Sequence, residues 1–220
     1  MLVTKIRRII GLVLCLGSIA ILVYTTWPNS FQSREVSFSH YELNKVAAEL
    51  EPGGAARLVF PEELQVQLDW PTWLRENEIG QVHLFVDTGM DATLLNGDLN
   101  IYDRYTMSLE TRLEFPGVQV APPGNVSQPL PEEGAIQFDW NIRPNERESP
   151  SGTLWLHLDF IPRSGGSIQH RLLMAQQVNL RTVNLLGINM VTAQVLGIVG
   201  VVIGVVLWID VLVDWVMRRK

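Results

Sequence analysis

The chain has 220 residues, of which 47% are hydrophobic, and its formal net charge is −6. This length accommodates one ordinary domain together with membrane segments. Between the two chain ends, 21 acidic residues stand against 11 lysines and arginines, so this part has no basic footprint for nucleic acid or for anionic lipid.

The first predicted element is a transmembrane helix over residues 9–27. The stretch Ile9–Thr26 carries no charge over 18 residues. As an α-helix it would span roughly 27 Å, which nearly matches the ~30 Å hydrocarbon core of a bilayer. Tyr24 and Trp27 close the stretch, and such amphipathic aromatic side chains prefer the headgroup level. We therefore expect residues 1–8 to form a short tail before a membrane span.

Two other interpretations of this stretch are a cleaved signal peptide and a lipoprotein anchor at Cys15. No small-x-small cleavage motif follows the stretch, and Leu14 stands directly before the cysteine, where a lipoprotein needs a small residue. We therefore expect a retained helix. Because Cys15 is the only cysteine, the chain has no intrachain disulfide and no cysteine-based metal site.

Residues 28–182 are predicted to form an all-β extracytoplasmic domain. Apolar and polar residues alternate from Gln81 to Asp87 and from Ile136 to Ile142, which is the pattern of a half-buried strand. Turns rich in Pro and Gly separate further strand-like stretches, which begin at Val36 or cover residues 58–68, 99–115, 153–161 and 172–180. Short helices are expected only at residues 41–51 and 73–78.

About seven strands without a long helix favour an antiparallel β-sandwich of immunoglobulin- or fibronectin-like architecture. True immunoglobulin domains carry a Cys…Trp…Cys framework. Trp140 and Trp155 are present here, but the cysteines are missing. The likeness is therefore to an architecture and not to a sequence family.

A second transmembrane helix is predicted over residues 191–213. It follows a short connector at residues 183–190 and precedes a tail at residues 214–220. The sequence is uncharged from Val191 to Ile209, which again is long enough to cross a bilayer.

Basic residues set the expected orientation of the two helices. Positively charged flanks of membrane helices stay in the cytoplasm. Such residues precede the first helix and follow the second one: Lys5, Arg7, Arg8, Arg218, Arg219 and Lys220. We therefore predict a cell-membrane protein with two spans, both termini in the cytoplasm and the central domain outside it.

Small residues predict close packing of the helices. Gly200 and Gly204 form a G-x-x-x-G element with Gly197 one turn earlier, and Gly11 and Cys15 have the same spacing of four in the first helix. Small residues four apart lie on one helix face and let another backbone come close. The partner can be the other helix of the same chain, a second copy of the chain or another membrane protein.

Two acidic residues, Asp210 and Asp214, lie four apart near the cytoplasmic end of the second helix and so share one face. An acid inside a membrane is costly and is usually paired, whereas a solvated helix end is the plainer interpretation. In an antiparallel hairpin, Arg7 and Arg8 reach the same level. We expect one of these arginines to pair with one of the aspartates.

Motifs for enzyme chemistry are missing from the sequence. There is no G-x-S-x-G elbow, no phosphate-binding P-loop and no H-E-x-x-H. His83 with Asp87, and His157 with Asp159, share strand faces and would suit zinc, but exposed strands commonly carry such pairs. We therefore predict no catalytic, cofactor-binding or metal-binding residues and no cofactor.

These observations favour a non-enzymatic accessory, structural or sensory subunit of a membrane protein complex. Its sandwich would bind an extracytoplasmic partner, and its helices would pack against another membrane protein or a second copy of the chain. One alternative is an outer-face enzyme or ligand-binding transport component, which needs polar groups converging around His83, His157 and Asp159. A further alternative is an envelope adhesion protein with contacts on loops such as Pro116–Pro131.

Overall fold

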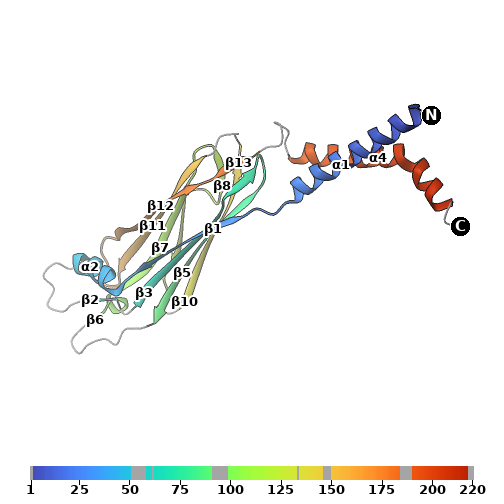
Figure 1. Ribbon diagram of the computed structural model, residues 1–220. Coiled ribbons are helices and arrows are strands. Elements are labelled where there is room, and N and C mark those ends of the chain that lie inside the picture. The colour runs from blue at the N-terminus through green and yellow to red at the C-terminus, as the bar shows by residue number, and fades with distance from the viewer. Residues whose placement is uncertain are drawn as a thin grey trace. The chain divides into compact units, whose positions relative to one another are not determined.

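The computed structural model describes residues 2–50, 58–60, 62–90, 99–132, 134–145, 150–183 and 190–217 (Figure 1). The side chains of residues 2–5, 8, 40, 62, 90 and 210–217 fall outside this description. The described chain divides into two compact units. One contains the terminal segments with residues 75–78, and the other contains residues 30–74 and 79–182. Each unit is described by itself.

Two long helices and two short ones are present in the described residues: α1 (Leu2–Thr26), α2 (His40–Leu50), α3 (Ile101–Arg104) and α4 (Met190–Met217). The strands are β1 (Phe31–Phe38), β2 (Leu58–Val59), β3 (Glu62–Pro71), β4 (Trp73–Arg75), β5 (Gly80–Met90), β6 (Leu99–Asn100), β7 (Tyr105–Glu114), β8 (Val118–Ala121), β9 (Asn125–Pro129), β10 (Gly134–Pro144), β11 (Ser151–Pro162), β12 (Gln169–Asn179) and β13 (Arg181–Val183).

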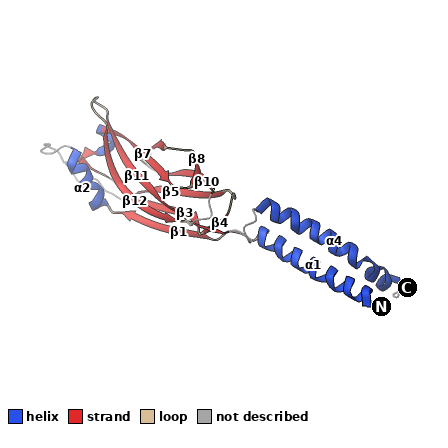
Figure 2. Cartoon of the chain, turned by 90° about the horizontal axis from the view of Figure 1, so that it is seen from above, coloured by secondary structure: helices blue, strands red, loops and turns tan. Residues whose placement is uncertain are grey.

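The central unit is a β-sandwich of two antiparallel sheets (Figure 2). One sheet has five strands in the order β1-β3-β5-β10-β8, and the other has four in the order β12-β11-β7-β9. Two small two-stranded sheets, β13-β4 and β2-β6, accompany them. In the described residues, β1 and β8 are therefore the edge strands of the larger sheet.

A single hydrophobic core fills the space between the two main sheets. Alternation places Val82, Leu84 and Val86 of β5 in this core at 0% exposure, while the residues between them face outward. Because side chains of a strand alternate between faces, each strand supplies one apolar and one polar row. Phe60 and Tyr105 pack edge-on against Phe160, each at 6.0 Å between ring centroids.

The predicted short helix at residues 41–51 is present as α2. It begins in a capping box, because the Ser39 backbone N–H donates to the Glu42 carboxylate at 3.0 Å while the Ser39 hydroxyl accepts from the Glu42 N–H at 3.5 Å. Leu43, Ala47 and Leu50 follow at helical spacing and are all buried in the core.

The prediction of a second short helix at residues 73–78 is wrong. The segment forms strand β4 and then a tight turn, in which Asn77 adopts the left-handed conformation with φ 64°. The Glu78 carboxylate accepts the Arg75 backbone N–H at 2.8 Å, and the Glu78 N–H donates to the Arg75 carbonyl at 3.0 Å. These two hydrogen bonds close a tight turn in place of a helix. Asparagine tolerates the left-handed backbone conformation that the turn requires at position 77.

The sandwich architecture was predicted correctly, but two of its strands were not. The proline-rich segment expected to be a contact loop, Pro116–Pro131, contains strands β8 and β9, whose partly buried Val118, Val120 and Val126 pack on the core. Apart from the additional edge strands β1 and β9, the strand orders β3-β5-β10-β8 and β12-β11-β7 are those of the two sheets of an immunoglobulin sandwich. Asn96-Gly97, a dipeptide that favours a tight hairpin turn, lies outside the described residues.

Close packing at the start of β11 gives a test of the sandwich. A Cβ at Gly152 would lie 2.5 Å from the Glu114 carbonyl oxygen and 2.6 Å from the Phe115 ring. We therefore expect Gly152→Ala to destabilise the full chain by about 1–3 kcal/mol, measured by thermal unfolding in detergent. Gly89→Ala is the matched control, because the nearest atom to its Cβ would be 3.9 Å away. Equal melting temperatures for the two variants would contradict this packing.

Candidate functional site

Helices α1 and α4 lie side by side as an antiparallel pair (Figures 1 and 2). On α1 the buried positions Gly11, Ser18 and Thr25 recur every seven residues. On α4 the buried positions follow one another at steps of four, three and four residues: Ala193, Gly197, Gly200 and Gly204. This 3.5-residue period is that of a left-handed coiled coil, here with small residues at the contact.

Glycine allows the two backbones to approach closely at the contact, which we call the glycine seam (Gly11, Cys15 and Ser18 of α1; Gly197, Gly200 and Gly204 of α4). A Cβ at Gly204 would lie 2.9 Å from the Gly11 carbonyl oxygen and 3.0 Å from the Cys15 backbone nitrogen. At Gly200 an added Cβ would collide with the Ser18 hydroxyl. At Gly197 it would lie 2.8 Å from the Leu22 side chain.

All five residues singled out for helix packing therefore come together within one chain. Among the three partners left open, the structure places α1 of the same chain against the glycine face of α4. The sequence could not make this choice, because the spacing of small residues is the same whichever helix lies opposite.

The predicted charge pairing at the other end of the helices stays a prediction. The side chains of Arg8, Asp210 and Asp214 lie outside the described residues. Arg7 is described, and its Nε lies 3.4 Å from the Leu207 carbonyl oxygen of α4. The Arg7 side chain is thus at the level where the pairing was expected.

A buried arginine closes the other end of the helix unit. The Arg75 guanidinium, 4% exposed, donates to the carbonyl oxygens of Tyr24 at 2.5 Å and Trp27 at 2.7 Å. Carbonyls at the end of a helix lack intrahelical donors and carry partial negative charge, so a cation stabilises them. Glu78 holds the same guanidinium at 3.1 Å and accepts from the Asn29 amide at 3.1 Å. Sequence patterns gave no signal for Arg75.

The two histidines around which an outer-face enzyme site was expected, His83 and His157, lie on different sheets. His83 lies on β5 of the five-stranded sheet, and His157 lies on β11 of the four-stranded one. Both alternate with core residues and therefore face outward from opposite sheets. His83 contacts Asp139 at 2.6 Å instead of Asp87, and Asp159 contacts His170 at 2.8 Å. Within the described residues, no group of three or more His, Cys, Asp or Glu is arranged to hold a metal ion.

Cross-strand contacts determine the electrostatics around His83. The Asp139 carboxylate accepts hydrogen bonds from His83 and, at 2.7 Å, from the Gln137 amide. These bonds favour the ionised form, so they lower the pKa of Asp139 below its usual 3.8. The resulting stabilisation is present above the ordinary pKa of an aspartate and is lost as the pH falls through the lowered value.

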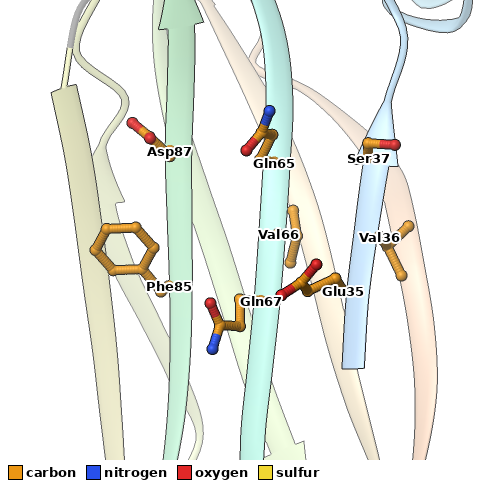
Figure 3. Close-up of a pocket in the computed structure, with 8 residues that line it drawn as sticks. All are labelled: Glu35, Val36, Ser37, Gln65, Val66, Gln67, Phe85 and Asp87. Carbon is orange, nitrogen blue, oxygen red and sulfur yellow. The ribbon is translucent and has the colours of Figure 1, made fainter. Parts of the chain in front are cut away.

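The outward face of the five-stranded sheet contains a groove of about 520 Å³. Its lining comes from the edge strand β1 and from β3 and β5: Glu35, Val36, Ser37, Gln65, Val66, Gln67, Phe85 and Asp87 (Figure 3). Strand register places Glu35, Gln67 and Phe85 in one row across the sheet. We call this site the outer-face groove. Sequence analysis placed Phe85 and Asp87 on one strand face but did not bring them together with β1.

No protein-family model matches the sequence, and no curated protein matches it.

The solved structures that are similar to part of this chain include the following three. A chain of the human seminal-plasma complex between zinc 2-glycoprotein and prolactin inducible protein is 14% identical, with a TM-score of 0.36 over 60% of this chain and 99% of that one. The PapD-like domain 7 of human CEP192 is 8% identical, with a TM-score of 0.33 over 61% and 93%. The major subunit AggA of the Escherichia coli aggregative adherence fimbriae type I is 12% identical, with a TM-score of 0.29 over 55% and 95%. At these scores the likenesses carry no inference about function.

Disulfide trapping tests the glycine seam directly. A Cβ at Gly204 would lie 3.0 Å from the Cys15 Cβ, so a local separation of the helices by about 0.5 Å brings the pair into the ~3.5–4.5 Å range of natural disulfides. We therefore expect Gly204→Cys to form an intrachain disulfide with Cys15 when vesicles are oxidised, visible as a monomer that loses both maleimide-reactive thiols. Val206→Cys, on the exposed side of α4, is the control and should stay reduced. A disulfide-linked dimer of the Gly204→Cys variant would show instead that the seam joins two chains.

The Arg75 contacts predict a large effect of a single substitution. Arg75→Ala removes the cation that neutralises the partly buried Glu78 carboxylate and that donates to the Tyr24 and Trp27 carbonyls, which should cost about 3–5 kcal/mol. The expected result is a clear drop in the melting temperature of the full chain in detergent. Arg112→Ala, which removes an exposed pair with Glu114, should cost less than about 1 kcal/mol. Similar small losses for both variants would argue against the helix-end role.

Proposed function

We propose that this protein is a membrane-anchored, non-enzymatic binding subunit. Its helix pair spans the bilayer, and its β-sandwich engages a protein partner outside the cytoplasm. The observation that carries the proposal is the surface of the helix pair: small residues lie at the helix contact, and large aliphatic side chains are exposed along the described part of both helices.

Both long helices contain a stretch that is long and apolar enough to cross a membrane, Ile9–Thr26 and Met190–Ile209. Only 17% and 22% of the residues in these stretches are buried. A core helix of a soluble protein would bury most of them. Side chains such as Val13, Ile198 and Val206 are more than half exposed, and an apolar surface of this kind marks contact with a membrane or with another protein.

The length of the helix contact supports retention of the first helix. Residues of α1 from Gly11 to Leu22 meet α4 from Leu207 back to Gly197. A signal peptide removed after translocation would leave the glycine face of α4 uncovered in the lipid. Because α1 already covers the glycine face of α4, an additional membrane partner would contact the exposed aliphatic side chains of the helix pair.

The sandwich favours binding over catalysis. The histidines that an enzyme site would need face outward from opposite sheets, whereas the outer-face groove offers amides, carboxylates and one aromatic ring on a broad sheet face. Protein interfaces combine such aromatic anchors with polar surroundings. The alternative of an adhesion protein expected its contacts on a loop at Pro116–Pro131. Most of this segment forms strands β8 and β9 instead.

Cysteine accessibility tests the anchoring and the orientation. In a Cys15→Ser background, Ser167→Cys reports on the sandwich and Thr4→Cys on the N-terminal end of α1. We expect a membrane-impermeant maleimide to label Ser167→Cys in intact cells, and to label Thr4→Cys only after permeabilisation. The protein should resist alkaline carbonate extraction. Release by carbonate, or the reverse labelling pattern, would contradict the proposal.

A further inference from the structure

We propose that the outer-face groove binds a positively charged, extended segment of the partner polypeptide, with a lysine or arginine side chain over Phe85. This inference rests on the proposed function, because it names the kind of partner that the sandwich would engage. It is carried by three independent features of the groove: its free carboxylates, its exposed aromatic ring and its polar amides.

The carboxylates of the groove differ from their neighbours on the same face. Asp69 accepts from the Gln67 amide at 3.0 Å, and Asp139 is held by His83. Neither Glu35 nor Asp87 has a hydrogen-bond or ion-pair partner among the described residues. These two carboxylates are therefore available to an incoming cation.

The charge around the groove is one-sided. On the outward face of the five-stranded sheet, the described residues include five acids: Glu35, Glu63, Asp69, Asp87 and Asp139. Arg34 lies next to Glu35 in β1, but its register with the core residue Leu68 places it on the opposite side of the strand. Arg143 lies farther along β10, opposite Gln119 of β8. A cationic ligand would thus meet attraction without a competing base in the groove.

Phe85 gives the site its shape and a second attraction. Its ring is 40% exposed at the centre of a polar face, where a large aromatic side chain has no core to fill. Figure 3 shows its ring beside Asp87 on β5, with the Gln65 and Gln67 amides on the neighbouring strand β3. An ammonium or guanidinium group over an aromatic face is favoured by the ring quadrupole, and an adjacent carboxylate adds to this attraction.

The spacing of the two free carboxylates suits an extended peptide. Glu35 and Asp87 are two strands and two residues apart, which corresponds to roughly 12 Å between their Cα atoms from standard strand spacing. Two side chains four positions apart in an extended peptide lie about 13 Å apart on one face. The Gln65 side chain, which has no hydrogen-bond partner among the described residues, can bind the peptide backbone between them.

The test uses the full chain in detergent and two fluorescent nine-residue peptides of alternating threonine and valine. One peptide carries two arginines four positions apart, and the other carries glutamates in their place. We expect the arginine peptide to bind, the glutamate peptide not to bind, and added salt to weaken binding. The double variant Glu35→Gln/Asp87→Asn and the single variant Phe85→Ala should each lose affinity about tenfold, the size expected for a charge-assisted contact.

A matched control separates the groove from the overall negative charge. Glu110→Gln/Glu114→Gln removes the same charge from the outward face of the four-stranded sheet, and its affinity should stay within about twofold of the original. Equal losses in the two double variants, or no binding of the arginine peptide, would overturn the inference.

Photocrosslinking in cells separates this failure from failure of the proposed function. A benzophenone side chain at position 85 should give a discrete protein adduct, whereas the same group at position 112 should not. If the adduct forms but the arginine peptide does not bind, the sandwich has a partner and the basic occupant is wrong. Without an adduct from position 85, both the inference and the proposed binding role fail.

Discussion

Backbone contact between the two long helices is the constraint on which the rest of the helix unit depends. At Gly204 a side chain as small as a methyl group would lie within 3.0 Å of backbone atoms in α1. Lipid offers no hydrophobic incentive for helices to associate, so close dispersion contact has to stabilise the pair. Because glycine allows this contact, the large aliphatic residues are left for the outer surface, where the proposed bilayer would solvate them.

A different rule organises the sandwich. Its two sheets bury one row of each strand in a common core and leave the other row to water. Function on such a fold depends on which outward rows become neighbours. Pairing of the edge strand β1 with β3 brings Glu35 into a row with Gln67 and Phe85. Together the three strands form a groove, although the outward residues of each strand alone have the pattern of ordinary exposed surface.

Sequence periodicity predicted most of the elements but not their partners. The alternation in Gln81–Asp87 and Ile136–Ile142 identified β5 and β10, because a half-buried strand must alternate. Residue types in 73–78 predict a helix, because they do not reveal the hydrogen bond from the Arg75 N–H to the Glu78 carboxylate or the left-handed conformation of Asn77. Strands β8 and β9 were missed because proline and glycine surround their few core-facing valines.

The sequence by itself determined two apolar helices, the small residues available for their contact, the acidic character of the central segment and the period-two alternation that makes a sandwich. Only the tertiary structure decided that Gly204 meets Gly11 of the same chain, that Arg75 closes the end of α1, and that His83 faces away from His157. Local sequence patterns reflect the preference of each residue for burial. Contacts between residues far apart in the sequence, such as Gly11 and Gly204, depend instead on strand order and helix direction. These arise from the fold as a whole, because each apolar face has to find a complementary one.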